Sequence, residues 1–331
     1  MKTRDSLALP PSPNLTTALR AGFDAITHHV VLILFPVALD LLLWLGPRLR
    51  LTQLIKSFVR QLVALYSLQD PGSAETLRSG QEVWNLVAEQ FNLLGALRAY
   101  PVGIPSLMVS RFPQQTPVGQ PILWEIQSLG VVLLAWALIT VVGLMAGTYY
   151  FVVVCQASLA GQVNWRQALI RWPGAALQVF FLALLWAGLL VAASIPGSFI
   201  FSLVALGGFS LGQCVVILFT GFLIWPMLPL LFSTHGIFVN QHNMIASLKS
   251  SVLLTQRTLP TTFLFLMIVL LLSKGLDLLW LAPPETSWMT LVGVAGHAFI
   301  TTGLLASSFI YYRDADRWVR SMILQKNLAL R

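Results

Sequence analysis

Residues 172–201, WPGAALQVFFLALLWAGLLVAASIPGSFIF, decide the fold class of this chain. They open a run between Arg171 and Lys249 that contains no Asp, Glu, Lys or Arg. In a soluble protein this run would expose a large apolar surface to water, because it has no charged residues to place there. In a bilayer, about 20 such residues form one helical crossing. The run therefore predicts membrane-spanning helices rather than the core of a soluble domain.

The composition of the whole chain supports the same prediction. Of the 331 residues, 56% are hydrophobic and 10% are charged, and the mean hydropathy is +0.78. Because soluble domains have roughly 25% charged residues, this composition excludes a soluble enzyme, and it is too apolar for a disordered chain. We expect one all-α membrane domain over residues 1–331.

Six segments are long or apolar enough to cross the membrane as helices. They are residues 30–46, 129–155, 174–195, 211–232, 261–281 and 288–311. Pro196 is expected to end or kink the third helix, which leaves residues 198–206 as a short interfacial or re-entrant piece. The prediction is a polytopic helix bundle with about six transmembrane helices.

The distribution of Lys and Arg predicts the orientation of these helices. With the N-terminus in the cytoplasm, most basic residues outside segment 47–128 fall on cytoplasmic segments, and the outer loops near 207–208 and 283–287 have none. Both termini are therefore expected to be cytoplasmic. We attribute the net charge of +8 to these edges, and we expect membrane lipids and possible membrane-protein partners rather than nucleic acid.

Residues 47–128 are expected to form an extracytoplasmic helical insert within the first hairpin. Apolar residues at helical spacing predict amphipathic helices over residues 51–66 and 83–97, with a turn at 69–72. A proline-rich connection leads back to the membrane. Two interpretations remain open: the insert lies on or packs over the bundle without chemistry, or it is a lid or docking surface over an outward-facing cavity.

An internal repeat is suggested by three similar segments, which begin at Asn14, Asn164 and Asn243. Each contains Asn, a small residue, Leu and a nearby basic residue, and each precedes an odd-numbered crossing. Asn is a favourable N-cap, so each segment predicts the start of a short interfacial helix. The expected architecture is three tandem units, each an interfacial helix followed by a transmembrane hairpin.

Two segments of the sequence carry a family resemblance. Residues 245–251, IASLKSS, and the ending at 307–318 with Tyr311-Tyr312-Arg313-Asp314 resemble a set of poorly characterised bacterial six-helix membrane proteins. That set includes the membrane domain fused to glycerophosphodiester phosphodiesterases. The resemblance covers most of the chain except the insert, and it implies a bacterial cytoplasmic (inner) membrane location. The phosphodiesterase domain is missing, so neither that activity nor catalytic residues are implied.

Three ionisable residues are predicted to lie inside the membrane, where such groups are expensive and often functional. They are Asp40, Lys274 and Asp277. Lys274 and Asp277 are three residues apart and share a helix face, and Lys274 is expected to be able to bridge both acids. The cluster is interpreted either as an interhelical clamp or as a polar floor that binds a proton, an ion or a lipid headgroup.

His297 lies among small residues in GVAGHA, residues 293–298, near the middle of the sixth predicted helix. It is interpreted as a hydrogen-bonded packing residue, with tetrapyrrole or metal ligation and proton handling as alternatives. His235 and His242 are placed in a cytoplasmic loop without other metal ligands nearby. No cofactor and no metal site are expected.

The sequence also lacks the common catalytic motifs, including GxxxxGK[ST], HExxH, GxSxG and CxxC. These absences favour an integral membrane protein that is not an enzyme and that acts as an accessory or scaffold protein or engages lipids. A small transporter or permease subunit that uses Asp40, Lys274 and Asp277 is the alternative. A membrane-embedded enzyme acting on lipids is a third interpretation.

Overall fold

The computed structural model describes residues 12–69, 74–207, 221 and 227–329 of the protein. Its elements in chain order are α1 (Leu15–His28), η2 (Val30–Ile33), α2 (Leu34–Leu45), β1 (Arg48–Arg50), α3 (Thr52–Gln69), α4 (Ala74–Gln90), η4 (Leu93–Leu97), α5 (Met108–Arg111), β2 (Leu123–Glu125), α6 (Leu129–Ala160), α7 (Trp165–Gly207), η5 (Leu228–Leu230), α9 (His235–Val239), α10 (Met244–Arg257), α11 (Leu259–Trp280) and α12 (Thr290–Ala329). The predicted all-α fold class is confirmed.

Several helices are long and apolar enough to cross a membrane. In the described part of the chain these are α6, α7, α11 and α12, and α1 with the Val30–Leu45 segment forms a further bent pair with an angle of 93°. The protein is therefore a multi-pass helical membrane protein. The fourth predicted crossing, residues 211–232, lies largely outside the described residues, so the number six stays a prediction.

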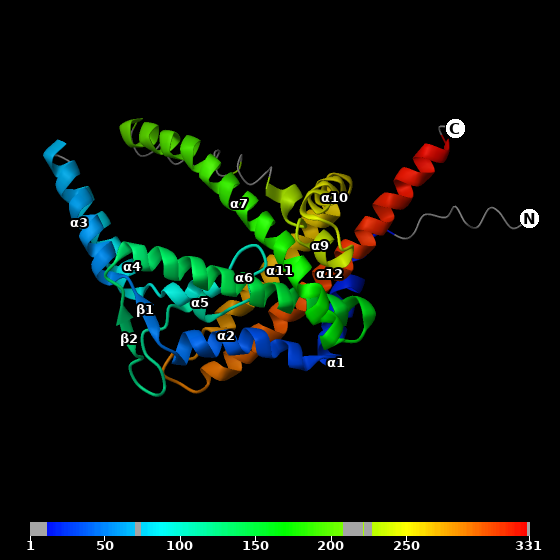
Figure 1. Ribbon diagram of the computed structural model, residues 1–331, viewed down its shortest axis with the longest axis horizontal. Helices are drawn as coiled ribbons and strands as arrows, with labels where there is room; N and C mark the ends of the chain where they lie inside the picture. Colours follow the sequence, from blue (N-terminus) through cyan, green and yellow to red (C-terminus); the bar gives the residue numbers. More distant parts are fainter. Residues whose placement is uncertain (1–11, 70–73, 208–220, 222–226, 330–331) are drawn as a thin grey trace, which may run out of the picture.

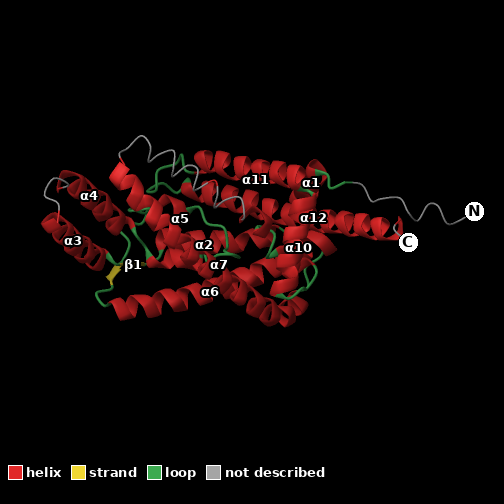
Figure 2. Ribbon diagram, turned by 90° about the horizontal axis from the view of Figure 1, so that it is seen from above, coloured by secondary structure: helices red, strands yellow, loops and turns green. Residues whose placement is uncertain are grey.

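Helix α12 is the centre of the bundle. It contacts α1, α2, α6, α10 and α11, and Figure 2 shows α6 and α11 on opposite sides of it. In its most apolar window 56% of the residues are buried, against 17–22% in the other three long helices. Those helices instead expose large apolar side chains, such as Leu133, Leu184 and Leu271, as expected for helices that face lipid.

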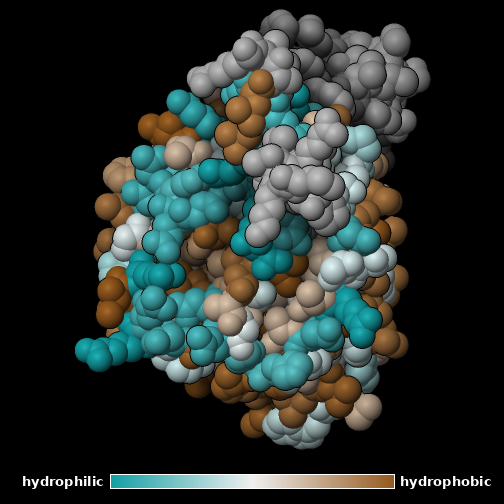
Figure 3. Space-filling view, turned by 90° about the vertical axis from the view of Figure 1, so that its right-hand side faces the viewer, coloured by the Kyte–Doolittle hydropathy of each residue, from teal (hydrophilic) through white to brown (hydrophobic). Residues whose placement is uncertain are grey.

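The two ends of the bundle carry different elements (Figure 1). The α6–α7 turn and α10 lie at the same end as the two chain termini, whereas β1, β2, α3 and α4 lie at the opposite end. Hydrophilic side chains cover much of the end that bears the termini (Figure 3). The segments predicted to be cytoplasmic thus share one end, and the assignment of that end to the cytoplasm stays a prediction.

The three predicted asparagine caps are present. Asn14 Oδ1 accepts hydrogen bonds from the N–H groups of Thr16 and Thr17, Asn164 Oδ1 accepts one from Gln167, and Asn243 Oδ1 accepts one from Ala246. After the first and third caps a separate helix ends before the crossing begins. After Asn164, however, one continuous helix of 43 residues begins, so the repeat is imperfect and stays a prediction.

Of the two effects expected of Pro196, ending or kinking the third helix, the first does not occur. The helix continues through Pro196 to Gly207, and residues 198–206 are helical rather than a separate re-entrant piece. Two serine hydroxyls flank the proline and bond backbone carbonyls: Ser194 donates to Val191 and Ser198 donates to Ser194, both at 2.7 Å. Such bonds are one means by which a membrane helix tolerates proline.

The insert consists of a projecting hairpin and a packed connection. Both amphipathic helices exist, but the second runs from Ala74 to Gln90 instead of covering residues 83–97, because Asn92 starts a new 3-10 turn. Most of the predicted turn at 69–72 lies outside the described residues. The connection packs into the bundle, where Val102 and Leu107 are fully buried and the missing side chain of Gly147 admits the Val102 backbone.

Candidate functional site

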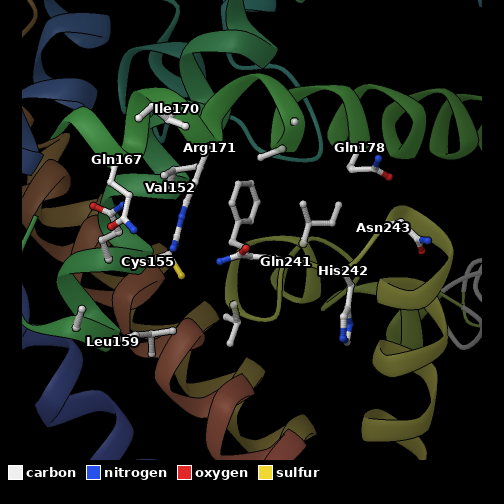
Figure 4. A pocket seen from close by; sticks show the side chains of 17 residues that line it. Val152, Cys155, Leu159, Gln167, Ile170, Arg171, Gln178, Gln241, His242 and Asn243 are labelled. Carbon is white, nitrogen blue, oxygen red and sulfur yellow. The ribbon is translucent and has the colours of Figure 1, made fainter. Parts of the chain in front are cut away.

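A cavity of about 670 Å³ lies between α6, α7 and the connection from α9 to α10 (Figure 4). Its volume is typical of small-molecule sites. It lies near the end of the bundle where the α6–α7 turn and α10 are found (Figure 1). Its walls are Val152, Cys155, Gln156, Leu159, Ala160, Gln167, Ile170, Arg171, Gly174, Ala175, Gln178, Ile237, Phe238, Val239, Gln241, His242 and Asn243.

One part of this cavity is polar and positively charged. Figure 4 shows Arg171 extending from α7 towards Cys155 on α6, while Gln241 approaches from the α9–α10 connection. None of the described residues that line the cavity is acidic, and no described ion pair involves Arg171. The guanidinium is therefore available to an anionic group.

Two buried polar atoms in the cavity wall lack a hydrogen-bond partner among the described residues. They are Nε2 of Gln156 and Nδ1 of His242. The Gln156 side chain is oriented because its Oε1 accepts a hydrogen bond from the Asn164 N–H at 3.1 Å. Leaving a buried polar atom unpaired costs about 1–3 kcal/mol, so these two atoms are polar groups of the wall whose hydrogen-bonding capacity is unused among the described residues.

The remaining wall is apolar. Val152, Ile237 and Phe238 are buried and turn aliphatic or aromatic side chains to the cavity. A cavity with a cationic, amide-rich part and an apolar part matches an amphiphile better than it matches a free ion or a polar metabolite.

A hydrogen bond and a strained residue fix the part of the cavity wall that precedes α10. The Met244 N–H donates to Gln178 Oε1 at 2.8 Å, which joins the start of α10 to α7. Gln241 has φ 55°, a left-handed conformation that is uncommon for a residue other than glycine. Such local strain, of order 1–3 kcal/mol, is often found where a side chain must face a functional site.

His235 anchors α9, the short helix that supplies part of the wall. Its Nε2 and the Ser308 hydroxyl of α12 are hydrogen-bonded at 2.8 Å, and its ring packs between the rings of Phe232, Phe309 and Tyr312. Burial lowers the pKa of His235 to about 3. The imidazole is therefore neutral in the folded protein. The sequence placed His235 in a loop, whereas the structure has it buried in the short helix α9.

Acidification is expected to destabilise the protein through His235. Between pH 6.5 and 3 the unfolded chain protonates this residue and the folded chain does not. The contribution of His235 to the free energy of unfolding is therefore fully present above pH 6.5 and is lost as the pH falls below it. By pH 5 the loss is about 2 kcal/mol. The apparent Tm should therefore fall less between pH 7.5 and 5 in His235→Asn than in wild type. His28→Gln, which changes an exposed histidine, should follow wild type, and a parallel fall in His235→Asn would contradict the assignment.

Asp40, the first predicted site residue, is completely buried and acts as a structural acceptor. Its carboxylate accepts hydrogen bonds from the Ser106 hydroxyl at 2.5 Å, the Leu107 N–H at 3.1 Å and the Met108 N–H at 2.9 Å. It therefore ties α2 to the insert at the start of α5. From the sequence, Lys274 was the expected partner of Asp40. In the structure, Asp40 instead bonds the insert, through two backbone N–H groups and the Ser106 hydroxyl.

Lys274 and Asp277 pair as predicted, and His297 joins them. Lys274 Nζ lies 2.9 Å from one oxygen of Asp277, and His297 Nδ1 lies 2.9 Å from the other. Asp277 and His297 are buried, so the pair links α11 to α12. His297 also lies within electrostatic range of Asp40, although no described bond joins them.

The small residues around His297 make room for a neighbouring helix rather than for a flat ligand. A Cβ added at Gly296 would lie 2.7 Å from the ring of Trp280, and one added at Gly293 would meet the Trp280 backbone. The indole of Trp280 thus occupies the space beside His297 that a tetrapyrrole would need. Among the described residues no group of three His, Cys, Asp or Glu side chains could hold a metal ion.

The sequence-predicted cluster and the cavity are separate features. Neither this cavity nor the smaller ones beside α3 and β1 is lined by Asp40, Lys274, Asp277 or His297. Arg171, Gln241 and His242 were not selected from the sequence as site residues. Only the position of Arg171 at the edge of the charge-free run could have drawn attention to it.

Comparisons with protein families, with curated proteins and with solved structures found no match to this chain.

Proposed function

We propose that the protein is a non-enzymatic membrane protein that binds an anionic phospholipid in the cavity at Arg171. The proposal depends on one observation: a cavity of about 670 Å³ combines the exposed guanidinium of Arg171, which has no ion-pair partner among the described residues, with an apolar wall. A lipid phosphate supplies the anion that Arg171 lacks, and the first part of an acyl chain fits against Val152 and Phe238. The cavity lies at the end assigned to the cytoplasmic leaflet, which is rich in anionic lipid.

The internal bonds of the polar cluster weigh against transport. Asp40 is held by three donors of the insert, and Asp277 is shared between Lys274 and His297. A transport site needs a water-accessible path to such groups, and none of the described cavities includes them. The lipid-engaging interpretation is therefore preferred to the transporter interpretation.

Replacement of Arg171 should weaken binding of an anionic lipid. Loss of a charge-assisted hydrogen bond of about 1.5–3 kcal/mol predicts a roughly 10- to 100-fold higher Kd for phosphatidylglycerol in Arg171→Gln. Binding is measured with fluorescent phosphatidylglycerol in dodecyl maltoside micelles. Arg166→Gln is the matched control, because Arg166 is an exposed arginine of the same helix end that does not line the cavity.

A second variant tests the apolar part without changing charge. A Cβ at Gly174 meets no atom within 4 Å, so the side chain of Gly174→Leu can enter the cavity without displacing the backbone. This variant should fold like wild type and lose phosphatidylglycerol binding. Affinities equal to wild type in both Arg171→Gln and Gly174→Leu would refute the proposed function.

A further inference from the structure

Arg48, at the opposite end of the molecule from Arg171, is a buried cation without a partner. Only 2% of its surface is exposed, and its Nη1 and Nη2 have no hydrogen-bond partner among the described residues. No ion pair in the described part of the chain includes it. A buried guanidinium normally has a carboxylate or phosphate partner, since the desolvation of an unpaired charge is expensive.

Glu285, the acidic group that acts on Arg48 electrostatically, does not serve as this partner. Glu285 attracts Arg48 electrostatically, but its two carboxylate oxygens accept hydrogen bonds from the N–H groups of Gln114 and Gln115, both at 2.8 Å. Burial and the neighbouring charge of Arg50 both lower the pKa of Arg48. Because an arginine stays protonated in proteins, this environment makes the folded state less stable until an anion arrives.

Arg48 borders a small cavity between α2, α5 and the end of α4. The cavity has a volume of about 40 Å³, which is room for about three water molecules or one small acidic group. Asn92 also lines it. The Asn92 Oδ1 accepts hydrogen bonds from the N–H groups of Leu49 and Leu94, which leaves its amide nitrogen as the group it can offer to a ligand.

We propose that this cavity binds one oxyanion group, such as a phosphate, through the two terminal nitrogens of Arg48 and the amide of Asn92. The planar fork of a guanidinium matches two oxygens of a phosphate, which favours an oxyanion over a halide. The site lies beside β1, at the end of the bundle opposite the termini (Figure 1), so the phosphate can come from solution or from a lipid headgroup. It is independent of the lipid site at Arg171.

The test measures the apparent Tm of the full-length protein in dodecyl maltoside. Inorganic phosphate is added at constant ionic strength, and in a second arm phosphatidylglycerol is compared with diacylglycerol of the same acyl chains. The lipid arm uses the Arg171→Gln background, so that the contribution of the other cavity is reduced. Near-saturating binding should raise the Tm by about 3 °C or more.

Three variants assign this rise to the cavity. Arg48→Gln should abolish it. Asn92→Asp should also abolish it, because the new carboxylate keeps the acceptor for Leu49 and Leu94 while supplying Arg48 with an internal partner. Arg98→Gln, which removes an exposed arginine of the same region, should respond like the parent protein.

The outcomes separate the sources and decide the proposal. A rise with inorganic phosphate identifies a free anion, and a rise with phosphatidylglycerol alone identifies a headgroup, provided that Arg48→Gln and Asn92→Asp do not respond. The proposal is overturned if neither probe raises the Tm, or if Arg48→Gln responds as strongly as Arg98→Gln.

Discussion

Asp40→Leu is expected to remove most of the folded protein. The substitution deletes the acceptor of three buried hydrogen bonds and leaves the N–H groups of Leu107 and Met108 and the Ser106 hydroxyl unpaired. Unpaired buried donors of this kind predict a loss of about 3–5 kcal/mol, which is a large part of typical protein stability. The measurement is the monodisperse fraction after detergent extraction, together with the apparent Tm.

Two comparisons show whether the loss is specific. Asp24→Leu changes an exposed acid whose one ion pair among the described residues, with Arg20, is long at 3.8 Å, and its yield should stay close to that of wild type. Asp40→Asn keeps one oxygen acceptor and should give an intermediate yield. If Asp40→Leu instead folds normally but loses a bound ligand or an activity, Asp40 belongs to a functional site and the anchor interpretation is wrong.

Gly22→Leu should be the second severe change. Gly22 of α1 lies against α12, and a Cβ at this position would be 2.6 Å from the Ser307 Cα. Because that atom belongs to the backbone, α1 has to move away from the central helix. Overpacking on this scale predicts a loss of about 3 kcal/mol, or a fall of roughly 6–12 °C in apparent Tm.

Gly80→Leu is the control for this prediction. Gly80 lies within α4, and a Cβ there meets no atom within 4 Å. Leucine is a better helix former than glycine, so Gly80→Leu should be as stable as wild type or more stable. Equal Tm values in the two variants would show that the packing of α1 on α12 does not limit stability.

The sequence predicted the features that depend on local pattern. Apolar length identified the crossings that the structure describes, and cap chemistry located the helix starts after Asn14, Asn164 and Asn243. The pair of Lys274 and Asp277 followed from their spacing on one helix face. The continuation of α7 through Pro196 did not follow, because a local rule for proline neglects the neighbouring hydroxyls.

The sequence could not predict features that depend on tertiary packing. The partners of Asp40 come from an irregular segment more than sixty residues away, which has no periodicity to reveal its position. The cavity combines α6, α7 and the α9–α10 connection, and no spacing joins those walls. From the sequence, Arg171 could be used only to predict the orientation of the helices. That Arg48 is buried without a side-chain partner among the described residues could be seen only in the structure.

The hairpin of α3 and α4 leaves the bundle and returns to it at one point. The Leu49 N–H donates to Asn92 Oδ1 at 3.2 Å, and Thr52 Oγ1 donates to the Ala88 carbonyl at the same distance. The two stems are thus fixed next to each other, whatever the length of chain between them. We therefore expect that the hairpin can be lengthened, shortened or replaced by a foreign domain without a change in the spacing of the transmembrane crossings.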